Sequence, residues 1–236
     1  MNIALIGYGK MGKAIHSLAE SDGIHVISII DPKSSQYKTI TEESMKNVDV
    51  CIEFTTPESC IDNIKKILSY KKHMVIGTTG WERHLPEIKE EVHKQNLGLI
   101  YASNFSVGVN LLYRIVESTS QLFAQVTAYD PYIIEAHHKH KKDAPSGTAK
   151  ELISIISKQY KRKEKDFSVA VTRAGAIPGV HEVGFDSSFD TIRINHTARN
   201  RNGFAAGALL AAKFIKDKKG FFHFRDEFEK IIGGLQ

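Results

Sequence analysis

Asn2-Ile-Ala-Leu-Ile-Gly-Tyr-Gly-Lys-Met-Gly12 is the stretch that decides the fold of this 236-residue chain. A short apolar run ends in glycines spaced G-x-G-x-x-G, and apolar residues at helical spacing follow from Ala14 to Ala19. A second apolar run, residues 24–30, ends at Asp31, about 20 residues past the last glycine. This order of strand, glycine turn, helix, strand and acid is the fingerprint of a dinucleotide-binding βαβ unit. The alternative is a glycine-rich turn that holds no nucleotide.

The fingerprint indicates which residues contact a cofactor. Glycines let the backbone approach a pyrophosphate at the positive end of the helix. The candidates in this turn are Gly7, Gly9, Lys10, Met11 and Gly12. Asp31 can accept hydrogen bonds from the ribose hydroxyls of NADH, while Lys33 can pair with the 2′-phosphate of NADPH. Because the lysine–phosphate attraction and the repulsion from Asp31 are of similar size, we expect either NADH or NADPH to serve, with less than about tenfold discrimination.

Further strand–helix units extend the same domain. Apolar strand runs at residues 48–54, 74–76 and 99–102 alternate with helical segments. Two of these runs end in Phe-Thr-Thr and Gly-Thr-Thr, and the carboxyl ends of parallel strands share the edge where open α/β sheets bind ligands. The residues at this edge include Phe54, Gly77, Thr78 and Thr79. Gly77 can equally be a simple turn former.

The second half of the chain has a different pattern. A strand-like run near residues 129–138 is followed, after a helix, by strand-like stretches at residues 167–173, 181–186 and 191–197. Because no helix separates the last three, we expect antiparallel pairing within a mixed four-stranded sheet. Two helices should cover one face of this sheet and leave the other for self-association. Helical segments up to residue 216 and from about residue 225 should return to the first domain.

The predicted fold class is α/β with two domains. Residues 1–106 and 204–236 form a Rossmann-type dinucleotide-binding domain. Residues 107–203 form an α+β substrate-binding and oligomerisation domain with a mixed sheet.

The segment Glu-Ala-His-His-Lys-His-Lys-Lys-Asp-Ala-Pro-Ser-Gly-Thr-Ala, residues 135–149, is the strongest candidate for chemistry. Ser146 can cap the following helix, which would leave the backbone N–H groups of Gly147 and Thr148 unpaired and able to bind an anion. This combination suits a small carboxylate substrate that needs a proton. The alternatives are a solvated basic face and a metal site. Since the three lysines would repel a cation, we expect no metal.

This segment resembles the E-x-H-H-x-x-K-x-D-A-P-S-G-T-A signature of the 4-hydroxy-tetrahydrodipicolinate reductase (dihydrodipicolinate reductase) family, with every fixed position present. The resemblance implies reduction of a cyclic, unsaturated dicarboxylate by NADH or NADPH, with His137 as catalytic acid and Lys141 as its partner. The residues that would hold the substrate carboxylates are His138, Lys141, Gly147 and Thr148. Glu135 and Asp143 are expected to hold the basic loop together, or merely to screen its charges.

The resemblance extends over essentially the whole chain. The Gly-Thr-Thr segment at residues 77–79 and the pair Asn104 and Phe105 match family residues close to the nicotinamide, which makes them candidate cofactor contacts. The family also implies a homotetramer. One departure is the glycine loop, because many members have G-x-x-G-x-x-G where this chain has the tighter G-x-G-x-x-G. Individual loop contacts therefore differ, while the pyrophosphate role is unaffected.

The composition narrows the class of protein. With 42% hydrophobic and 25% charged residues, the chain is typical of a globular protein, and its net charge of +5 favours anionic partners. No helix-turn-helix or arginine-rich helix indicates nucleic acid, and no apolar run approaches the roughly 18 residues of a membrane span. Cys51 and Cys60 lack zinc-like or CxxC spacing, so we expect reduced thiols in a cytoplasmic protein. The remaining rivals are another split-domain NAD(P)-linked dehydrogenase, which would need its own catalytic residue, and a dinucleotide-sensing regulator.

Overall fold

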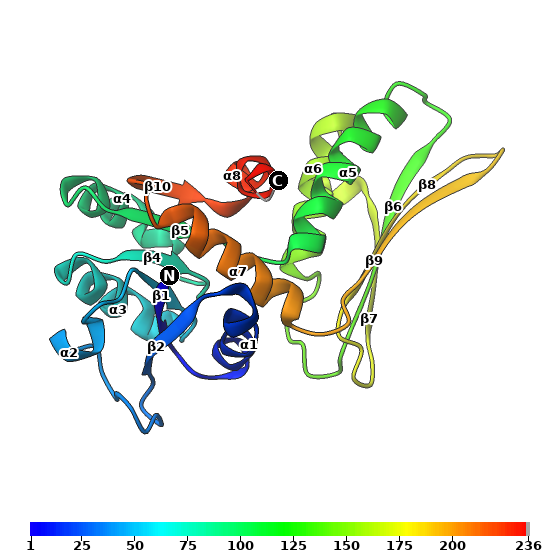
Figure 1. Ribbon diagram of the computed structural model, residues 1–236. Coiled ribbons are helices and arrows are strands. Elements are labelled where there is room, and N and C mark those ends of the chain that lie inside the picture. The colour runs from blue at the N-terminus through cyan, green and yellow to red at the C-terminus, as the bar shows by residue number, and fades with distance from the viewer. Residues whose placement is uncertain (235–236) are drawn as a thin grey trace. The chain divides into compact units, whose positions relative to one another are not determined.

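The structure, a computed structural model, describes residues 1–234 (Figure 1). The chain divides into two units by its internal contacts. The first unit contains residues 1–106 and the segment from Arg201 on, and the second contains residues 107–200. The first unit is therefore discontinuous in sequence.

A six-stranded sheet in the order β10-β5-β4-β3-β1-β2 forms the centre of the first unit, with every neighbouring pair parallel. β2 lies on one side of β1 and β3 on the other, so the strand order reverses at β1. A crevice opens at such a switch point, beyond the carboxyl ends of the strands. The strands are β1 (Asn2–Ile6), β2 (His25–Ile30), β3 (Val50–Glu53), β4 (His73–Ile76), β5 (Gly98–Tyr101) and β10 (Gly220–His223).

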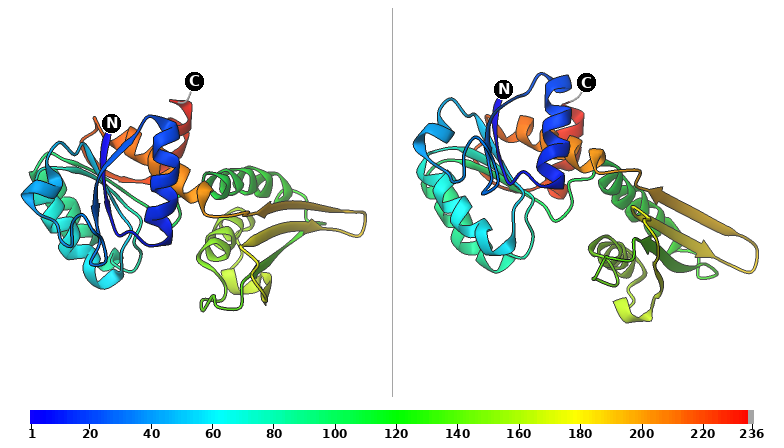
Figure 2. Two further views of the ribbon diagram at one scale, coloured as in Figure 1. Left: turned by 60° about the horizontal axis from the view of Figure 1, so that its bottom comes forward. Right: turned by 90° about the horizontal axis from the view of Figure 1, so that it is seen from below.

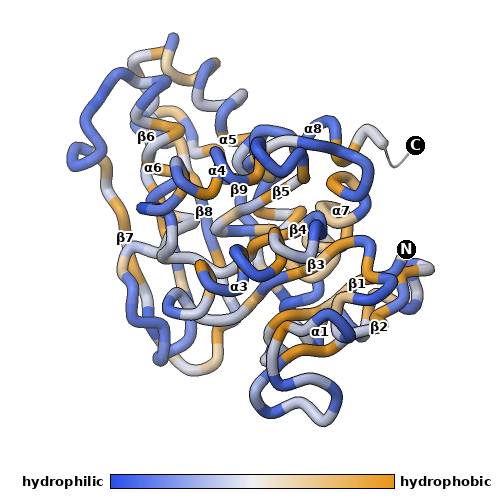
Figure 3. The backbone as a smooth tube through the Cα atoms, turned by 90° about the vertical axis from the view of Figure 1, so that its left-hand side faces the viewer, coloured by the Kyte–Doolittle hydropathy of each residue, from blue (hydrophilic) through white to orange (hydrophobic). Residues whose placement is uncertain are grey.

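Helices cover both faces of this sheet, with α1 and α7 on one face and α3 and α4 on the other (Figure 2). All four residues of β3 are buried, as expected for a parallel strand between two helix layers. The hydropathy colouring of Figure 3 shows the apolar segments of β1, β3 and β4 together in the interior. The helices are α1 (Lys10–Ala19), α2 (Glu42–Met45), α3 (Pro57–Ser69), α4 (Leu85–Lys94), α7 (Asn202–Ile215) and α8 (Phe224–Gly233), with 3-10 turns η1 (Glu20–Asp22) and η2 (Glu82–His84).

The strand β10 is absent from the sequence-based prediction. It spans only Gly-Phe-Phe-His and follows a lysine-rich turn, so it has no alternating pattern long enough to indicate a strand. It pairs parallel with β5 at the edge of the sheet. The returning part of the chain therefore contributes a strand as well as two helices to the first unit.

The second unit contains a four-stranded sheet in the order β7-β6-β8-β9. Its sheet is mixed, as predicted, but the expected antiparallel pairing of all three later strands is wrong for β7. β7 pairs parallel with β6, because α6 crosses over between them, whereas β6–β8 and β8–β9 are antiparallel. The elements are α5 (Val107–Phe123), β6 (Asp130–His137), α6 (Gly147–Tyr160), η3 (Glu164–Asp166), β7 (Ser168–Arg173), β8 (Val180–Asp186) and β9 (Thr191–Thr197).

The core of the second unit lies between the sheet and the two helices α5 and α6. Ile133 on β6 and Val183 and Phe185 on β8 pack against apolar residues of both helices. Ile134, the neighbour of Ile133, points to the opposite face and is 40% exposed. None of the helices in residues 1–234 combines the length and apolar character that crossing a bilayer requires.

Candidate active site

The glycine turn after β1 is shaped by close packing. A Cβ at Gly7, where φ is +90°, would overlap the carbonyl oxygen of Phe54, and a Cβ at Gly12 would overlap the carbonyl oxygen of Gly7. Gly9, by contrast, has open space beside it. It is also the N-cap of α1, and no side chain caps this helix start or places an acid in its first turn. The positive end of α1 therefore suits the pyrophosphate of a dinucleotide.

A pocket of about 400 Å³ lies beside this turn. Its lining residues are Gly9, Lys10, Met11, Phe54, Thr55, Pro57, Gly77, Thr78 and Thr79. The structure thus brings together predicted cofactor residues from three strand ends, and it adds Thr55 and Pro57 to them. Both had a signal in the sequence, since Thr55 directly follows Phe54 and Pro57 begins the next helix, α3.

Glu53, the last residue of β3, contacts the pocket residue Thr55 and was missed by the sequence analysis. It is fully buried, and it accepts hydrogen bonds from the Thr55 hydroxyl and from the Asn63 side-chain amide at 3.3 Å. Burial raises the pKa of Glu53. The Thr78 hydroxyl oxygen in turn accepts from the backbone N–H of Thr55 at 2.8 Å. The Thr55–Thr78 bond joins the ends of β3 and β4, and the Glu53–Asn63 bond joins β3 to α3.

Asp31 lies at the end of β2 as predicted. Its carboxylate accepts from the backbone N–H groups of Tyr8 at 2.8 Å and Lys33 at 2.9 Å. These two hydrogen bonds lower the pKa of Asp31, so the acid stays charged and suited to accept from ribose hydroxyls.

Two predicted cofactor residues, Asn104 and Phe105, do not line this pocket. The Asn104 side-chain oxygen accepts from the backbone N–H of Ser106 at 2.8 Å. Phe105 is 2% exposed and packs against Phe54 and Phe224 with ring centroids 6.1 and 4.8 Å apart. The side chain of Phe105 is therefore core, and only its backbone is suited to meet a ligand.

In the second unit, β6 and α6 present the basic segment. β6 ends at His137, which is buried. Ser146 is the N-cap of α6, as predicted, and its hydroxyl accepts from the N–H of Ala149 at 3.1 Å. Glu135 fixes this cap, because its carboxylate accepts from the backbone N–H of Ser146 at 3.0 Å. Glu135 thus joins the strand to the helix start, consistent with the expected role in holding the loop.

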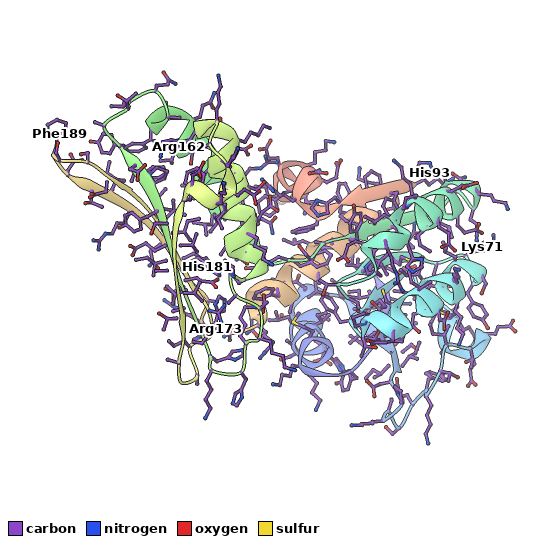
Figure 4. The ribbon with its side chains drawn as sticks, turned by 180° about the vertical axis from the view of Figure 1, so that it is seen from behind. Lys71, His93, Arg162, Arg173, His181 and Phe189 are labelled. Carbon is purple, nitrogen blue, oxygen red and sulfur yellow. The ribbon has the colours of Figure 1, made fainter. Side chains whose placement is uncertain are left out.

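Glu135 also lies at the centre of a buried cluster that the sequence analysis did not predict. Arg173 at the end of β7 donates to its Oε1 at 2.7 Å, and His181 on β8 has its Nε2 3.6 Å from Oε2 and 3.1 Å from the Ser146 hydroxyl (Figure 4). Burial would raise the pKa of Glu135, but the hydrogen bonds from Ser146 and Arg173 lower it overall. The carboxylate is therefore charged within the cluster.

The two buried imidazoles of the cluster are held neutral. Burial lowers the pKa of His181 to about 4, and its neighbour His137 adds to the effect. Burial also lowers the pKa of His137; Glu135 acts to raise it, while Lys141 and Arg173 act to lower it. The two rings meet edge to face with centroids 5.0 Å apart.

Lys141 has a partner within the basic segment itself. Its Nζ is 2.8 Å from the Asp143 carboxylate. Burial would raise the pKa of Asp143, but Lys141 and the backbone N–H of Gly147 lower it. The Gly147 N–H, predicted to bind an anion, therefore lies close enough to the Asp143 carboxylate to lower its pKa. His138 has a buried Nδ1 without a hydrogen-bond partner among residues 1–234.

Two family models match the chain and together cover nearly all of it. Residues 1–105 match the N-terminus of dihydrodipicolinate reductase, and residues 108–228 match its C-terminus. The chain belongs to the dihydrodipicolinate reductase family.

Curated relatives agree with this assignment. The chain is 34% identical to the 4-hydroxy-tetrahydrodipicolinate reductase of Christiangramia forsetii over 98% of its own length and 99% of the relative. It is 31% identical to the enzyme of that name from Methanoregula boonei, over 89% and 90% of the two chains. A solved structure, dipicolinate-bound dihydrodipicolinate reductase from Paenisporosarcina sp. TG-14, shares the fold with a TM-score of 0.80 at 22% identity, covering 96% of this chain and 98% of that one.

The strand pattern of the sequence contains a signal for the buried cluster around Glu135, which was not predicted. His181 shares the inward face of β8 with Val183 and Phe185, and Arg173 follows Val169 and Val171 at alternate positions. A basic residue on an apolar face needs a buried partner. Glu135, His137 and His181 place ligand atoms within 4.8 Å of one another, a spacing that a metal can use. Because Arg173 already contacts that carboxylate, we interpret the cluster as a hydrogen-bonded network.

Proposed function

We propose that this chain catalyses the NAD(P)H-dependent reduction of 4-hydroxy-tetrahydrodipicolinate to tetrahydrodipicolinate, in the diaminopimelate route to lysine. The observation that supports it best is the buried imidazole of His137 at the end of β6, with Lys141 on the following loop beside the start of α6, in a chain that matches this family in both halves. In the balanced reaction, one hydride and one proton are added to the ring and one water leaves.

The first unit is the proposed cofactor domain. Bound NADH or NADPH supplies the hydride. The uncapped start of α1 would hold the pyrophosphate, Asp31 the adenosine ribose, and the strand ends bearing Phe54 and Thr78 the nicotinamide side. The pocket fits such a group, because the open space beside Gly9 is bounded by an uncapped helix end rather than by an acid.

The second unit is the proposed substrate and oligomerisation domain. His138, Lys141 and the start of α6 at Gly147 and Thr148 would hold the two carboxylates, and the substrate would displace Asp143 from Lys141. Hydride addition to a conjugated C=C–C=N system builds electron density on the ring, so a positioned proton donor is required. His137 and Lys141 are the donors within the cluster, and the bound carboxylates fix the ring that receives the proton.

A coupled assay tests the proposal. Pyruvate, aspartate semialdehyde and the preceding synthase supply the substrate, and loss of reduced-nicotinamide absorbance is followed with NADH and with NADPH. We expect turnover with both. Turnover with other aldehyde or amino-acid substrates alone would favour the rival dehydrogenase, and a salt-dependent shift on DNA without turnover would favour the regulator.

We also propose a homotetramer located in the cytoplasm. The sheet face of the second unit that bears Ile134 has no helix over it among the described residues of that unit, and a partly apolar sheet face suits self-association. Cys51 and Cys60 are buried and free, and burial raises the pKa of Cys51 to about 12, which suits a reducing compartment. Light scattering tests the assembly, since a mass near 26.4 kDa would mean a single chain.

A further inference from the structure

Arg173 contacts both Glu135 and His137 in the proposed catalytic cluster, although no sequence motif indicated it. It is the last residue of β7 and pairs in register with His137, the last residue of β6. Its side chain is only 17% exposed. A guanidinium this enclosed needs several acceptors to offset its desolvation.

Four acceptor atoms surround the two terminal nitrogens of Arg173. Nη2 donates to Glu135 Oε1 at 2.7 Å and to the carbonyl oxygen of Asp143 at 2.6 Å. Nη1 donates to the carbonyl oxygen of Thr172 at 2.9 Å and lies 3.4 Å from Nδ1 of His137. One side chain thus contacts β6, β7 and the loop that bears Lys141.

We propose that Arg173 is a positioning residue that holds His137 in the Nε2–H tautomer and ties it to Lys141 through Asp143. This inference rests on the proposed function, in which His137 and Lys141 supply the proton.

The tautomer follows from what each group can donate. A guanidinium has only N–H donors, so the ring nitrogen that faces Arg173 must present its lone pair. The competing partner of the same Nδ1 is Glu135 Oε2, which is 3.7 Å away and accepts from the Ser146 N–H at 3.2 Å. The closer Arg173 therefore determines the tautomer, and the single ring proton resides on Nε2.

The charges around His137 favour the same neutral state. The groups that face it are Glu135 on its own strand, Arg173 on β7, His181 on β8, and Lys141 and Asp143 on the following loop. Placing a second proton on Nδ1 would direct it at the guanidinium. Burial, with the charges of Lys141 and Arg173, accordingly lowers the pKa of His137.

The other end of the ring is left accessible by a glycine. A Cβ at Gly179, where φ is +146°, would lie 3.4 Å from Nε2 and Cδ2 of His137. Because Gly179 has no side chain, the proton-bearing nitrogen is not covered on this side.

The link to Lys141 runs through one residue. Arg173 Nη2 holds the backbone carbonyl of Asp143, and the Asp143 carboxylate lies 2.8 Å from Lys141 Nζ. Loss of Arg173 should therefore release Lys141 and His137 together. A residue that served only the stability of β7 would have no such paired effect.

The first test needs no substrate. Protein labelled with ¹⁵N-histidine is examined by long-range ¹H–¹⁵N correlation, and the His137 signals are assigned by their loss in His137→Asn. We expect the Nε2–H pattern in the free enzyme. An Nδ1–H pattern or a charged ring at neutral pH would overturn the proposal.

The second test replaces Arg173. In Arg173→Met, Glu135 becomes the partner of His137 Nδ1, so we expect the proton to move to Nδ1, the pKa of His137 to rise, and kcat to fall by about ten- to a hundredfold. The KM for NADH should not change. Arg173→Lys keeps the positive charge but lacks the two terminal nitrogens of the guanidinium. It should therefore keep the His137 ring neutral without restoring the full kcat. Arg162→Met, which removes an exposed arginine paired with Asp130, is the matched control.

An unchanged His137 tautomer and unchanged pH profile in Arg173→Met would contradict the proposal. If Arg173→Met does not fold, the spectrum of the wild type and that of Arg173→Lys still show whether Arg173 sets the tautomer of His137. The outcomes are separable from the proposed function: wild-type protein without reductase activity would reject the reaction, whereas the tautomer of its free form would still test Arg173.

Discussion

His137 is buried and Lys141 is partly buried, whereas Lys139, His140 and Lys142 of the same segment are exposed. We predict that His137→Ala and Lys141→Ala each lower kcat by about 10²–10⁴. Both should bind NADH as the wild type does, because the fingerprint lies in the other unit. Steady-state assays and NADH fluorescence titration measure the two effects. His140→Ala, which changes an exposed histidine of the same segment, is the control, and near-normal turnover in both test variants would refute their role.

His181 should make the stability of the protein sensitive to acid. Its pKa falls from an ordinary 6.5 to about 4 on burial, so the folded state binds its proton less readily than the unfolded state. The contribution is complete above pH 6.5 and is lost as the pH falls toward 4, by roughly 3 kcal/mol from this group. Urea unfolding followed by circular dichroism should show a shallower acid dependence in His181→Gln than in wild type. The exposed His25→Gln should follow the wild-type curve.

Lys33 should affect only one of the two cofactors. Its backbone N–H holds Asp31, while its side chain is exposed and near a position suited to a 2′-phosphate. Lys33→Ala should raise the KM for NADPH about two- to fivefold, the equivalent of a screened surface contact, and leave the KM for NADH unchanged. A wild-type preference of about a hundredfold for either nucleotide would show that the attraction of Lys33 for the 2′-phosphate and its repulsion by Asp31 are not of similar size.

For single residues, the sequence predicted those roles that depend on neighbours close along the chain. Ser146 was recognisable as a cap because its partner is three residues away. The Glu135–Arg173 pair joins residues 38 positions apart, and it depends on the register between β6 and β7. No short-range pattern encodes that register, so Arg173 was visible only as a basic side chain on an apolar face.

Among the elements, the turn between β7 and β8 is predicted to tolerate no side chain at Gly179 without loss of kcat. Gly179→Ala adds a methyl group 3.4 Å from His137 Nε2 and should lower kcat by about tenfold without changing cofactor binding. Gly175→Ala in the same turn is a matched control, because φ there is +48° and nothing lies within 4 Å of the added atom. Both variants strain the backbone, so equal losses of kcat would mean that strain, and not cover over the imidazole, is responsible.

The elements themselves were largely predictable, and their connections less so. β1, the glycine turn, α1 and β2 follow from periodicity and glycine spacing within thirty residues. The parallel pairing of β7 depends instead on α6 crossing over the sheet, and β10 is a strand only because β5 provides an unpaired edge. Both depend on tertiary structure, which overrides weak local preference.

For the whole molecule, assembly is expected to depend on the open sheet face of the second unit. Ile134→Lys places a charge on that face and should convert the proposed tetramer to smaller species by light scattering. Ile27→Lys changes an isoleucine of similar exposure, 37% against 40%, on β2 of the first unit and should leave the mass unchanged. A tetramer that survives Ile134→Lys would place the interface elsewhere.

The discontinuous first unit has a consequence for biosynthesis on the ribosome. β1 to β5 emerge first, but α7, which packs on β3, β4 and β5, and β10, which pairs with β5, are translated only after the entire second unit. Until then β3, β4 and β5 lack the helix that covers them on one sheet face, while the second unit, being contiguous, can fold as soon as it leaves the exit tunnel. The unit whose synthesis begins first is therefore the last to be completed, and a nascent chain stalled before residue 202 should attract chaperones that the released protein does not.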